Sequence, residues 1–265
     1  MIDYEQMPYG YSLDMNITDL CNIQCSHCYM KKRDLFLTFQ HAKIILDKLP
    51  QSLKRIVLSG GEPFLNYDVM YQIVDYARKR FGNTVKIRIS SNGKFFYETD
   101  DEIIAELRHM ESSSINQILL SNDKYHIDAG IKLERLIRIG ELATENNLKI
   151  KVKYLNIGNE APVGESKERD ENKIEKKKCL NRPENVFSPY LFTKTDGNVY
   201  VCAFRSLESL GNLFYDDWNI IANNIQKQYA YLCGNVMPEI IRKDSSNKNC
   251  ENFLKYGECY LCQNH

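Results

Sequence analysis

The chain has 265 residues, enough for one large domain or for a domain with a small appendage. Lysine and arginine balance aspartate and glutamate, 35 against 35, so no overall charge would attract nucleic acid or an anionic membrane. No apolar stretch reaches the ~18 residues of a membrane-spanning helix, and residues 1–10 are too polar for a secretory signal. We therefore expect a cytoplasmic protein with no nucleic-acid or membrane partner, whose nine cysteines are reduced and available to bind metal or iron–sulfur clusters.

Strand-like and helix-like segments alternate along the first part of the chain. In order, the sequence predicts strand Tyr11–Ile17, helix Thr38–Leu49, strand Arg55–Leu58, helix Asn66–Phe81, strand Val85–Ile89, helix Asp101–Met110, strand Ile115–Leu120, helix Ala129–Asn146 and strand Lys149–Leu155. Such alternation is typical of parallel strands joined by right-handed helical crossovers. It predicts an α/β fold: a partial TIM-type barrel of about five strands and four helices.

The second of these helices has the clearest apolar stripe. Asn66 stands at its N-cap position. Apolar residues then recur at intervals of three and four, the spacing of one buried helix face: Val69, Ile73, Val74, Ala77 and Phe81. We assign this stripe to the core.

A charged segment at residues 164–178 has little apolar content and is interpreted as a linker between residues 1–163 and residues 179–265. Beyond it, Tyr190–Thr193 and Val199–Cys202 flank an Asp-Gly turn, which is a strong hairpin signal. One helix, Trp218–Leu232, follows. We expect a small hairpin-plus-helix domain here.

Polar or metal-binding residues follow each of the first four predicted strands. They are the cysteines of residues 21–28, Gly60-Gly61-Glu62, Ser91-Asn92, and Ser121 with Asp123. The carboxyl ends of strands in a curled parallel sheet meet at one rim, where substrates bind. The sequence therefore predicts that these four clusters form one site.

Cys21, Cys25 and Cys28 are the most informative residues of the chain. Three thiolates can hold a four-iron cluster and leave one iron open to a substrate or cofactor. A zinc knuckle and buried structural cysteines are the alternatives. His27 is a poor fourth zinc ligand because it is directly adjacent to Cys28.

This loop and the turn Ser59-Gly60-Gly61-Glu62-Pro63 together resemble the radical S-adenosylmethionine (radical SAM) superfamily. Its hallmarks are a Cys-x3-Cys-x-aromatic-Cys loop after the first barrel strand and a Gly-Gly-Glu-Pro turn after the second; His27 stands at the aromatic position. The resemblance implies that a 4Fe-4S cluster on the three cysteines binds S-adenosyl-L-methionine (SAM). One electron from a flavodoxin-like or other reductant then yields methionine and a 5′-deoxyadenosyl radical, which removes a hydrogen atom from a C–H bond.

The resemblance also implies a set of SAM contacts. These are a backbone contact from His27 to adenine, the methionine end against Gly60, Gly61 and Glu62, and further contacts from Ser91, Asn92, Ser121 and Lys153. Glycine lets the backbone approach the cofactor closely. Ordinary turns are the alternative for the glycines and for Ser91-Asn92, and an outward lysine face with Lys149 and Lys151 is the alternative for Lys153.

Two more residues are candidates for contact with the substrate. Asp123 faces the substrate or caps a helix, and the sequence does not separate these roles. His126 is placed to hydrogen-bond or exchange a proton with substrate, although a lone histidine more often has a structural role.

A second set of cysteines lies in the C-terminal part of the chain. Cys179, Cys202, Cys259 and Cys262 resemble the ligands of a twitch domain, the short form of the SPASM domain, and imply an auxiliary 4Fe-4S cluster. Structural zinc is the alternative. Cys250 is a possible substitute for Cys259, and Cys233 is interpreted as a buried thiol or, if it reaches the site, a hydrogen-atom donor.

Three functions fit these features. The first is modification of a ribosomally made peptide or amino-acid residue by cross-linking, oxidation or epimerisation. The second is dehydrogenation of a small polyol or aminocyclitol, because the compact layout is similar to 2-deoxy-scyllo-inosamine dehydrogenase and the cluster loop begins only 20 residues in, with no room for a leader-binding domain. The third is a non-catalytic iron–sulfur or zinc protein.

Overall fold

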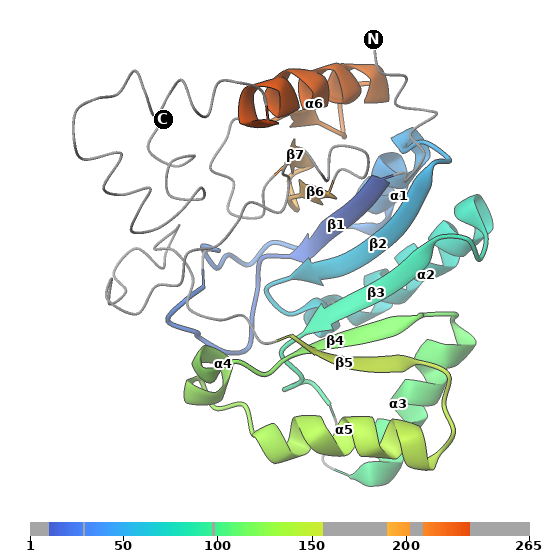
Figure 1. Ribbon diagram of the computed structural model, residues 1–265, viewed down its shortest axis with the longest axis vertical. Helices are drawn as coiled ribbons and strands as arrows, with labels where there is room; N and C mark the ends of the chain where they lie inside the picture. Colours follow the sequence, from blue (N-terminus) through green and yellow to red (C-terminus); the bar gives the residue numbers. More distant parts are fainter. Residues whose placement is uncertain (1–10, 29, 97–98, 156–189, 202–208, 234–265) are drawn as a thin grey trace.

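The computed structural model describes residues 11–28, 30–96, 99–155, 190–201 and 209–233. Five parallel strands form its centre: β1 (Tyr11–Thr18), β2 (Leu53–Gly60), β3 (Lys86–Ser91), β4 (Gln117–Ser121) and β5 (Lys151–Leu155). Each pairs with the next in chain order, so the sheet runs from β5 to β1 without interruption (Figure 1). This confirms the predicted α/β class and its parallel sheet.

A helix follows each of the first four strands: α1 (Phe39–Lys48), α2 (Tyr67–Phe81), α3 (Asp100–Ser112) and α5 (Leu133–Glu145). Two short elements were not predicted, the 3-10 turn η2 (Pro63–Asn66) and helix α4 (Lys124–Asp128). The helix expected over Ala129–Asn146 begins only at Leu133. Gly130 has a φ of +96°, outside the helical region, and separates α4 from α5.

Asn66 does not cap α2 as predicted. It occupies the N-cap position but makes no side-chain capping bond. Its amide instead donates to the carbonyl oxygens of Ile17, at 2.8 Å, and Leu37, at 3.0 Å. Because η2 leads directly into α2, the Asn66 side chain is used to attach this turn to the end of β1.

The two faces of the sheet differ in chemistry. Side chains on the face toward the helices are apolar and at most 1% exposed: Leu13, Met15, Ile17, Ile56, Ile87, Ile89, Ile118 and Leu120. Alternation places mostly polar residues on the opposite face: Ser12, Asp14, Asn16, Arg55, Ser59, Arg88, Ser90, Gln117, Lys151 and Lys153. The helices therefore cover one face of β1–β5, and the other is the polar inner face expected of a partial barrel.

The predicted hairpin is present. β6 (Tyr190–Thr193) pairs parallel with β1, and β7 (Asn198–Tyr200) and β8 (Gly211–Asn212) follow antiparallel. Gly197, with a φ of +83°, makes the turn. The hairpin extends the sheet of β1–β5 to eight strands. The division into residues 1–163 and residues 179–265 stays a prediction.

Helix α6 (Trp218–Cys233) begins where predicted and ends one residue later. Its first turns share the core of the barrel, since the Trp218 ring meets the ring of Tyr11 edge-on at 5.1 Å and Ile221 and Ile225 are fully buried. The linker predicted at residues 164–178 lies outside the described residues.

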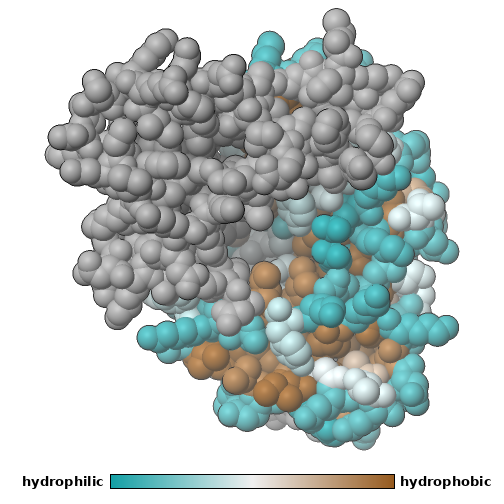
Figure 2. Space-filling model, in the orientation of Figure 1, coloured by the Kyte–Doolittle hydropathy of each residue, from teal (hydrophilic) through white to brown (hydrophobic). Residues whose placement is uncertain are grey.

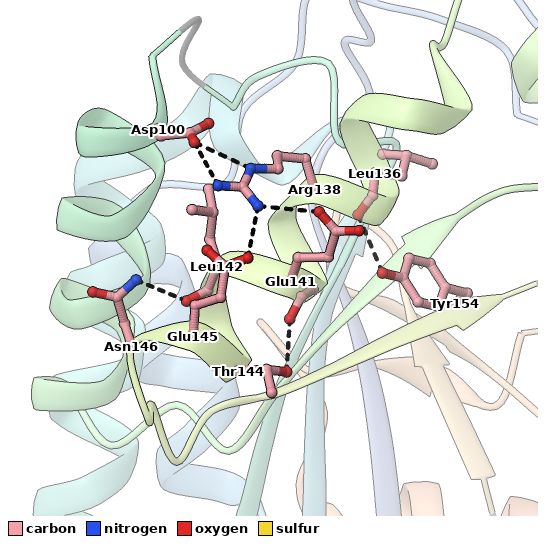
Figure 3. Close-up of polar contacts among 10 residues, drawn as sticks. Asp100, Leu136, Arg138, Glu141, Leu142, Thr144, Glu145, Asn146 and Tyr154 are labelled. Atoms are coloured by element: carbon pink, nitrogen blue, oxygen red, sulfur yellow. Dashed lines mark hydrogen bonds and ion pairs between the residues drawn. The ribbon is translucent and has the colours of Figure 1, made fainter.

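Polar contacts fix α5 to its neighbours (Figure 3). Arg138 on α5 donates to Asp100 at the start of α3, at 2.7 Å, and to Glu141 and Glu145 on its own helix, at 3.1 and 2.9 Å. The Tyr154 hydroxyl of β5 donates to a carbonyl oxygen of α5 at 3.2 Å. These bonds hold α3, α5 and β5 together at the end of the sheet.

This end of the molecule exposes several apolar side chains. Figure 2 shows hydrophobic residues gathered on the lower part of this face, which α4, α5 and β5 occupy in Figure 1. On these three elements Ile127, Leu133, Ile137, Tyr154 and Leu155 are each 37–44% exposed. Among the described residues, no helix is both long and apolar enough to cross a membrane.

Candidate active site at the carboxyl rim of the strands

The three N-terminal cysteines lie on a loop with closely joined ends. The loop leaves β1 at Thr18 and returns beside it, because Thr18 forms an antiparallel bridge with Phe36. The amide of Asp19 donates to the carbonyl of Leu35 at 2.9 Å, and that of Leu37 donates to Ile17 at 2.9 Å. Residues 19–36 are thereby anchored at the carboxyl end of β1, where the sequence predicts the site.

The thiols of Cys21, Cys25 and Cys28 are free and partly buried. A backbone bond from Cys28 to Cys25, 3.1 Å long, closes the turn between them. Burial raises the pKa of Cys21. It also raises the pKa of Cys25, to about 12, and the nearby Cys21 and Cys28 thiols add to the shift of Cys25. Three sulfur atoms thus share one region, and a bound metal would be needed to hold them as thiolates.

The glycines of the β2 turn are required by the protein's own backbone. A Cβ on Gly61 would lie 2.0 Å from the carbonyl oxygen of Leu20, and one on Gly60 would lie 2.2 Å from that of Thr18. The amide of Gly61 donates to Thr18 at 2.8 Å, and that of Glu62 donates to Leu20 at 2.9 Å. The turn therefore holds the base of the cysteine loop; a contact from these glycines to SAM stays a prediction.

Glu62 is fully buried and joins the second loop of the rim to the third. Its carboxylate accepts bonds from the Ser91 hydroxyl at 2.9 Å, the Asn92 amide at 2.8 Å and the Phe64 amide at 3.3 Å. Burial raises the pKa of Glu62 to about 7, although the three bonds oppose the shift. The Ser91 hydroxyl, which we expected to contact SAM, donates to Glu62 instead.

Asn92 joins the third loop to the cysteine loop. Its side-chain amide donates to the Asn22 side chain at 2.9 Å and lies 3.7 Å from the sulfur of Cys21. Lys94 strengthens this link, because its backbone amide donates to Asn92 at 2.8 Å and its ammonium group donates to the Asn22 carbonyl at 3.3 Å. Asn92 is therefore placed to donate to a cysteine of the loop.

Asp123 is the N-cap of α4, which confirms one of the two roles left open by the sequence. Its Oδ1 accepts from the backbone amides of Tyr125, at 2.9 Å, and His126, at 3.1 Å. The Oδ2 lies 2.8 Å from Nδ1 of the His126 ring. The carboxylate thus both begins the helix and orients the imidazole.

His27 packs against this cap. Its ring stacks on Tyr125 with centroids 4.7 Å apart and meets His126 edge-on at 4.9 Å. The Nε2 atom lies 3.9 Å from Asp123, and Nδ1 is buried without a hydrogen-bond partner among the described residues. Donor atoms of Cys25, His27 and His126 lie within 4.8 Å of one another, so the structure brings the cysteine loop and α4 together.

Tyr125 was not predicted as a site residue, although an aromatic residue two positions after Asp123 is visible in the sequence. Ser121 ends β4 and is 7% exposed. Lys153 pairs in register with Leu119, and alternation places it with Lys151 on the polar inner face, where both are exposed. Contacts from Ser121 and Lys153 to SAM stay predictions.

The predicted ligands of the second cluster, Cys179, Cys202, Cys259 and Cys262, lie outside the described residues, as does Cys250. Cys233 is the last residue of α6.

The cysteine loop and the sheet behind it belong to a recognisable family. The family model described as the Radical SAM superfamily matches residues 15–161, more than half of the chain. The chain belongs to the radical SAM superfamily. The match spans the cysteine loop, the Gly-Gly-Glu-Pro turn and all of β2–β5.

Similar sequences include an uncharacterised protein of Methanocaldococcus jannaschii, 33% identical over 100 residues, covering 36% of this chain and 35% of that protein. Another is the Fe-coproporphyrin III synthase of Methanosarcina barkeri, 31% identical over 119 residues, covering 42% of this chain and 28% of the synthase. A third is a GTP 3′,8-cyclase of Rhizobium leguminosarum, 21% identical over 145 residues, covering 51% and 39%. The matched segments span between about a quarter and two fifths of these relatives.

Two solved structures are similar over most of their length. BtrN in complex with AdoMet and 2-DOIA has a TM-score of 0.59, 15% identity and coverage of 84% of this chain and 86% of BtrN. Native anSMEcpe, with bound AdoMet and the Cp18Cys peptide, has a TM-score of 0.56, 15% identity and coverage of 94% of this chain and 88% of anSMEcpe. At this identity the likeness shows a shared fold.

Proposed function

We propose that this radical SAM protein is an enzyme that cleaves SAM reductively and removes a hydrogen atom from a C–H bond of its substrate. The observation that carries the proposal is the convergence of Cys21, Cys25 and Cys28, three free and partly buried thiols, at the carboxyl rim of a parallel sheet. Cys21, Cys25 and Cys28 are the only cysteines of residues 19–36, and three thiolates on one loop fit a 4Fe-4S cluster with one open iron. When bound, the cluster and SAM supply the 5′-deoxyadenosyl radical.

The residues of the rim have separate tasks in this proposal. Gly60 and Gly61 hold the base of the cysteine loop against β2, and Glu62 fixes the third loop. Asn92 donates an N–H bond toward the Cys21 sulfur. The His27 ring stacks on Tyr125 of α4 and lies close to Cys25, and its task in this proposal is to exclude water from Cys25. The proposal also includes SAM contacts from His27, from Ser121 at the end of β4 and from Lys153 on the inner face.

For the substrate, we favour a ribosomally made peptide or an amino-acid residue, which would make the protein an oxidoreductase or peptide maturase. The fold shared with anSMEcpe, whose structure contains a peptide, supports this choice. Dehydrogenation of a small polyol or aminocyclitol is the second candidate, supported by the fold shared with BtrN, whose structure contains 2-DOIA. A gene for a short precursor peptide beside this one would favour the first, and genes for sugar or cyclitol enzymes the second.

The proposal includes an auxiliary 4Fe-4S cluster on Cys179, Cys202, Cys259 and Cys262, in a twitch or SPASM-like unit. It also includes a cytoplasmic location and a flavodoxin-like or other one-electron reductant. A non-catalytic iron–sulfur or zinc protein is the remaining alternative, and the experiments below separate it from an enzyme.

Anaerobic reconstitution with iron, sulfide, SAM and dithionite tests the activity. We expect 5′-deoxyadenosine from the wild-type protein and none from Cys25→Ala, because two thiolates no longer hold the cluster with its open iron. Cys233→Ser, which removes a cysteine outside both predicted ligand sets, is the matched control and should still form the product. Wild-type protein with an intact cluster that forms no 5′-deoxyadenosine would contradict the assignment.

Metal analysis of the same preparations tests the second cluster. Two 4Fe-4S clusters predict about eight iron atoms per chain. A quadruple serine variant of Cys179, Cys202, Cys259 and Cys262 should retain about four. About four iron atoms and one zinc in the wild-type protein would show that the auxiliary site binds zinc instead.

A further inference from the structure

The polar inner face of β1–β5 carries an unbalanced charge. Five basic residues lie on it against one carboxylate, that of Asp14; the basic residues are Arg55, Lys86, Arg88, Lys151 and Lys153. This excess is local, because acidic and basic residues balance over the whole chain. A positive field over a face that leads to the active rim favours an anionic ligand.

Two of these residues, Arg55 on β2 and Arg88 on β3, are half-buried and lie diagonally across the strand pair, since Arg55 pairs with Lys86 and Arg88 with Val57. Neither makes a hydrogen bond or ion pair with any residue that the structure describes, and the Nε of Arg55 is buried without a partner. Other arginines of the chain do donate to protein acceptors: Arg33, Arg78, Arg80, Arg108 and Arg138. Arg55 and Arg88 thus offer a pair of guanidinium groups with unused donors.

The two guanidinium groups are close enough to affect each other. Burial lowers the pKa of Arg88, and the charge of Arg55 lowers it further. Both charges also act on Tyr190 of β6, whose pKa is raised by burial and by Asp14. The Asp14 carboxylate accepts a bond from the Ser59 hydroxyl. Holding two half-buried cations side by side is unfavourable unless an anion joins them.

We infer that Arg55 and Arg88 bind an anionic group of the substrate, a carboxylate or a phosphate. The inference rests on the proposed function and specifies its substrate class. The planar guanidinium fork binds the oxygens of either group through two parallel bonds. A second argument is position, since Arg88 lies three residues before Ser91 at the rim, roughly 10 Å at the rise of a parallel strand.

This spacing constrains the shape of the substrate. An anion held between the arginines leaves the rest of the molecule extending toward the rim, where the C–H bond would meet the radical. Lys151 and Lys153 lie on the same face and add positive charge along that path. The substrate is therefore an elongated anion, such as an acidic side chain of a peptide or a phosphorylated polyol.

Calorimetric titration of cluster-reconstituted protein with SAM bound tests the inference, with inorganic phosphate and acetate as separate probes. We expect one probe or both to bind the wild-type protein, and Arg55→Gln and Arg88→Gln each to weaken that binding about tenfold or more, because each removes charged hydrogen bonds. Lys54→Gln is the matched control: it removes one positive charge at the exposed position next to Arg55 in sequence. It should bind like the wild type.

Binding of phosphate alone would indicate a phosphate ester, and binding of acetate a carboxylate; either supports the inference. Absence of binding of both probes to the wild type, or equal binding by the glutamine variants, would overturn it. Circular dichroism checks folding, and the double variant R55K/R88K, which keeps the charges without the fork, should bind with intermediate affinity. SAM cleavage without anion binding would refute this inference alone, whereas anion binding without SAM cleavage would refute the proposed function alone.

Discussion

The structure gives a different reason for glycine at position 61 than the one that we inferred from the sequence. We expected glycine here so that the backbone could approach a cofactor. In the structure, the place of its Cβ is taken by the Leu20 carbonyl at the base of the cysteine loop. The glycine is therefore needed for the loop to be formed at all, before any cofactor binds.

Gly61→Ala should displace the cysteine loop, because a Cβ 2.0 Å from a carbonyl oxygen forces the backbone to move. We expect a loss of about 2 kcal/mol in unfolding free energy and a lower iron content after reconstitution. Urea denaturation and iron analysis measure the two effects. Gly82→Ala is the control, since its Cβ meets nothing within 4 Å and only its φ of +66° is strained; equal iron loss in both variants would contradict the prediction.

Glu62 is a second residue whose environment decides its behaviour. Burial raises its pKa from 4.5 to about 7, so the folded protein binds the proton more tightly than the unfolded chain. The contribution of this group to stability is complete below pH 4.5 and is lost as the pH rises toward 7.

Between pH 4.5 and 7.5, the titration of Glu62 should lower the unfolding free energy by about 3 kcal/mol. In Glu62→Gln this fall should be absent, so the stability of the variant changes less over the same range. Urea denaturation at several pH values measures the slope. Glu134→Gln, at an exposed position of α5, is the control and should keep the wild-type slope; identical slopes for Glu62→Gln and the wild type would refute the prediction.

At the scale of elements, helix α4 shows how a cap and a site can use the same side chain. Asp123 caps α4 through one carboxylate oxygen and faces the His126 ring through the other. Because His27 stacks on Tyr125 in the first turn of this helix, the cap also sets where α4 meets the cysteine loop.

Asp123→Ala should destabilise the protein by about 1 kcal/mol, the usual cost of losing an N-cap, and accelerate hydrogen exchange at the amides of Tyr125 and His126. Asp123→Asn retains a capping oxygen and should leave exchange close to that of the wild type. Unchanged exchange in the alanine variant would show that the cap does not hold α4. Equal loss of 5′-deoxyadenosine formation in both variants would assign the charge itself a role in the reaction.

At the scale of the whole molecule, Asp19 connects the two parts of the chain. Its buried carboxylate, at the end of β1, accepts from Arg33 of the cysteine loop at 2.6 Å and from the Thr195 hydroxyl at 3.1 Å. Thr195 lies in the turn between β6 and β7, which is 176 residues away in sequence. One side chain thus ties the cysteine loop to the hairpin.

Asp19→Asn should weaken both bonds, because the charge that strengthens them is lost. We expect unfolding free energy to fall by about 1–2 kcal/mol and limited proteolysis to cut faster between β6 and β7. Asp100→Asn breaks an exposed ion pair with Arg138 and is the control, for which we expect no change in proteolysis of the hairpin. Equal proteolysis in both variants would show that Asp19 does not hold the hairpin.

The regular elements were predictable because their signals are local. Helix α1 lies within one residue of its predicted bounds at each end, since Thr38 is a capping residue and apolar residues follow at helical spacing. Helix α4 escaped prediction because five residues are too few to show a period, and its one signal, the Asp123 cap, was also consistent with a site. The pairing of β6 with β1 escaped it because nothing near residue 190 specifies a partner so distant in sequence.

The amino-acid sequence by itself determined the class of fold, the four polar clusters after the strands and the superfamily, because alternation and cysteine spacing are short-range patterns that survive without coordinates. Only the tertiary structure decided what those residues contact. In the structure, the Ser91 hydroxyl donates to Glu62, the His27 ring stacks on Tyr125, and Arg55 lies near Arg88 on the inner face. The physical reason is that strand register and side-chain neighbours depend on contacts between residues far apart in the chain, and a one-residue shift would turn every strand side chain to the other face.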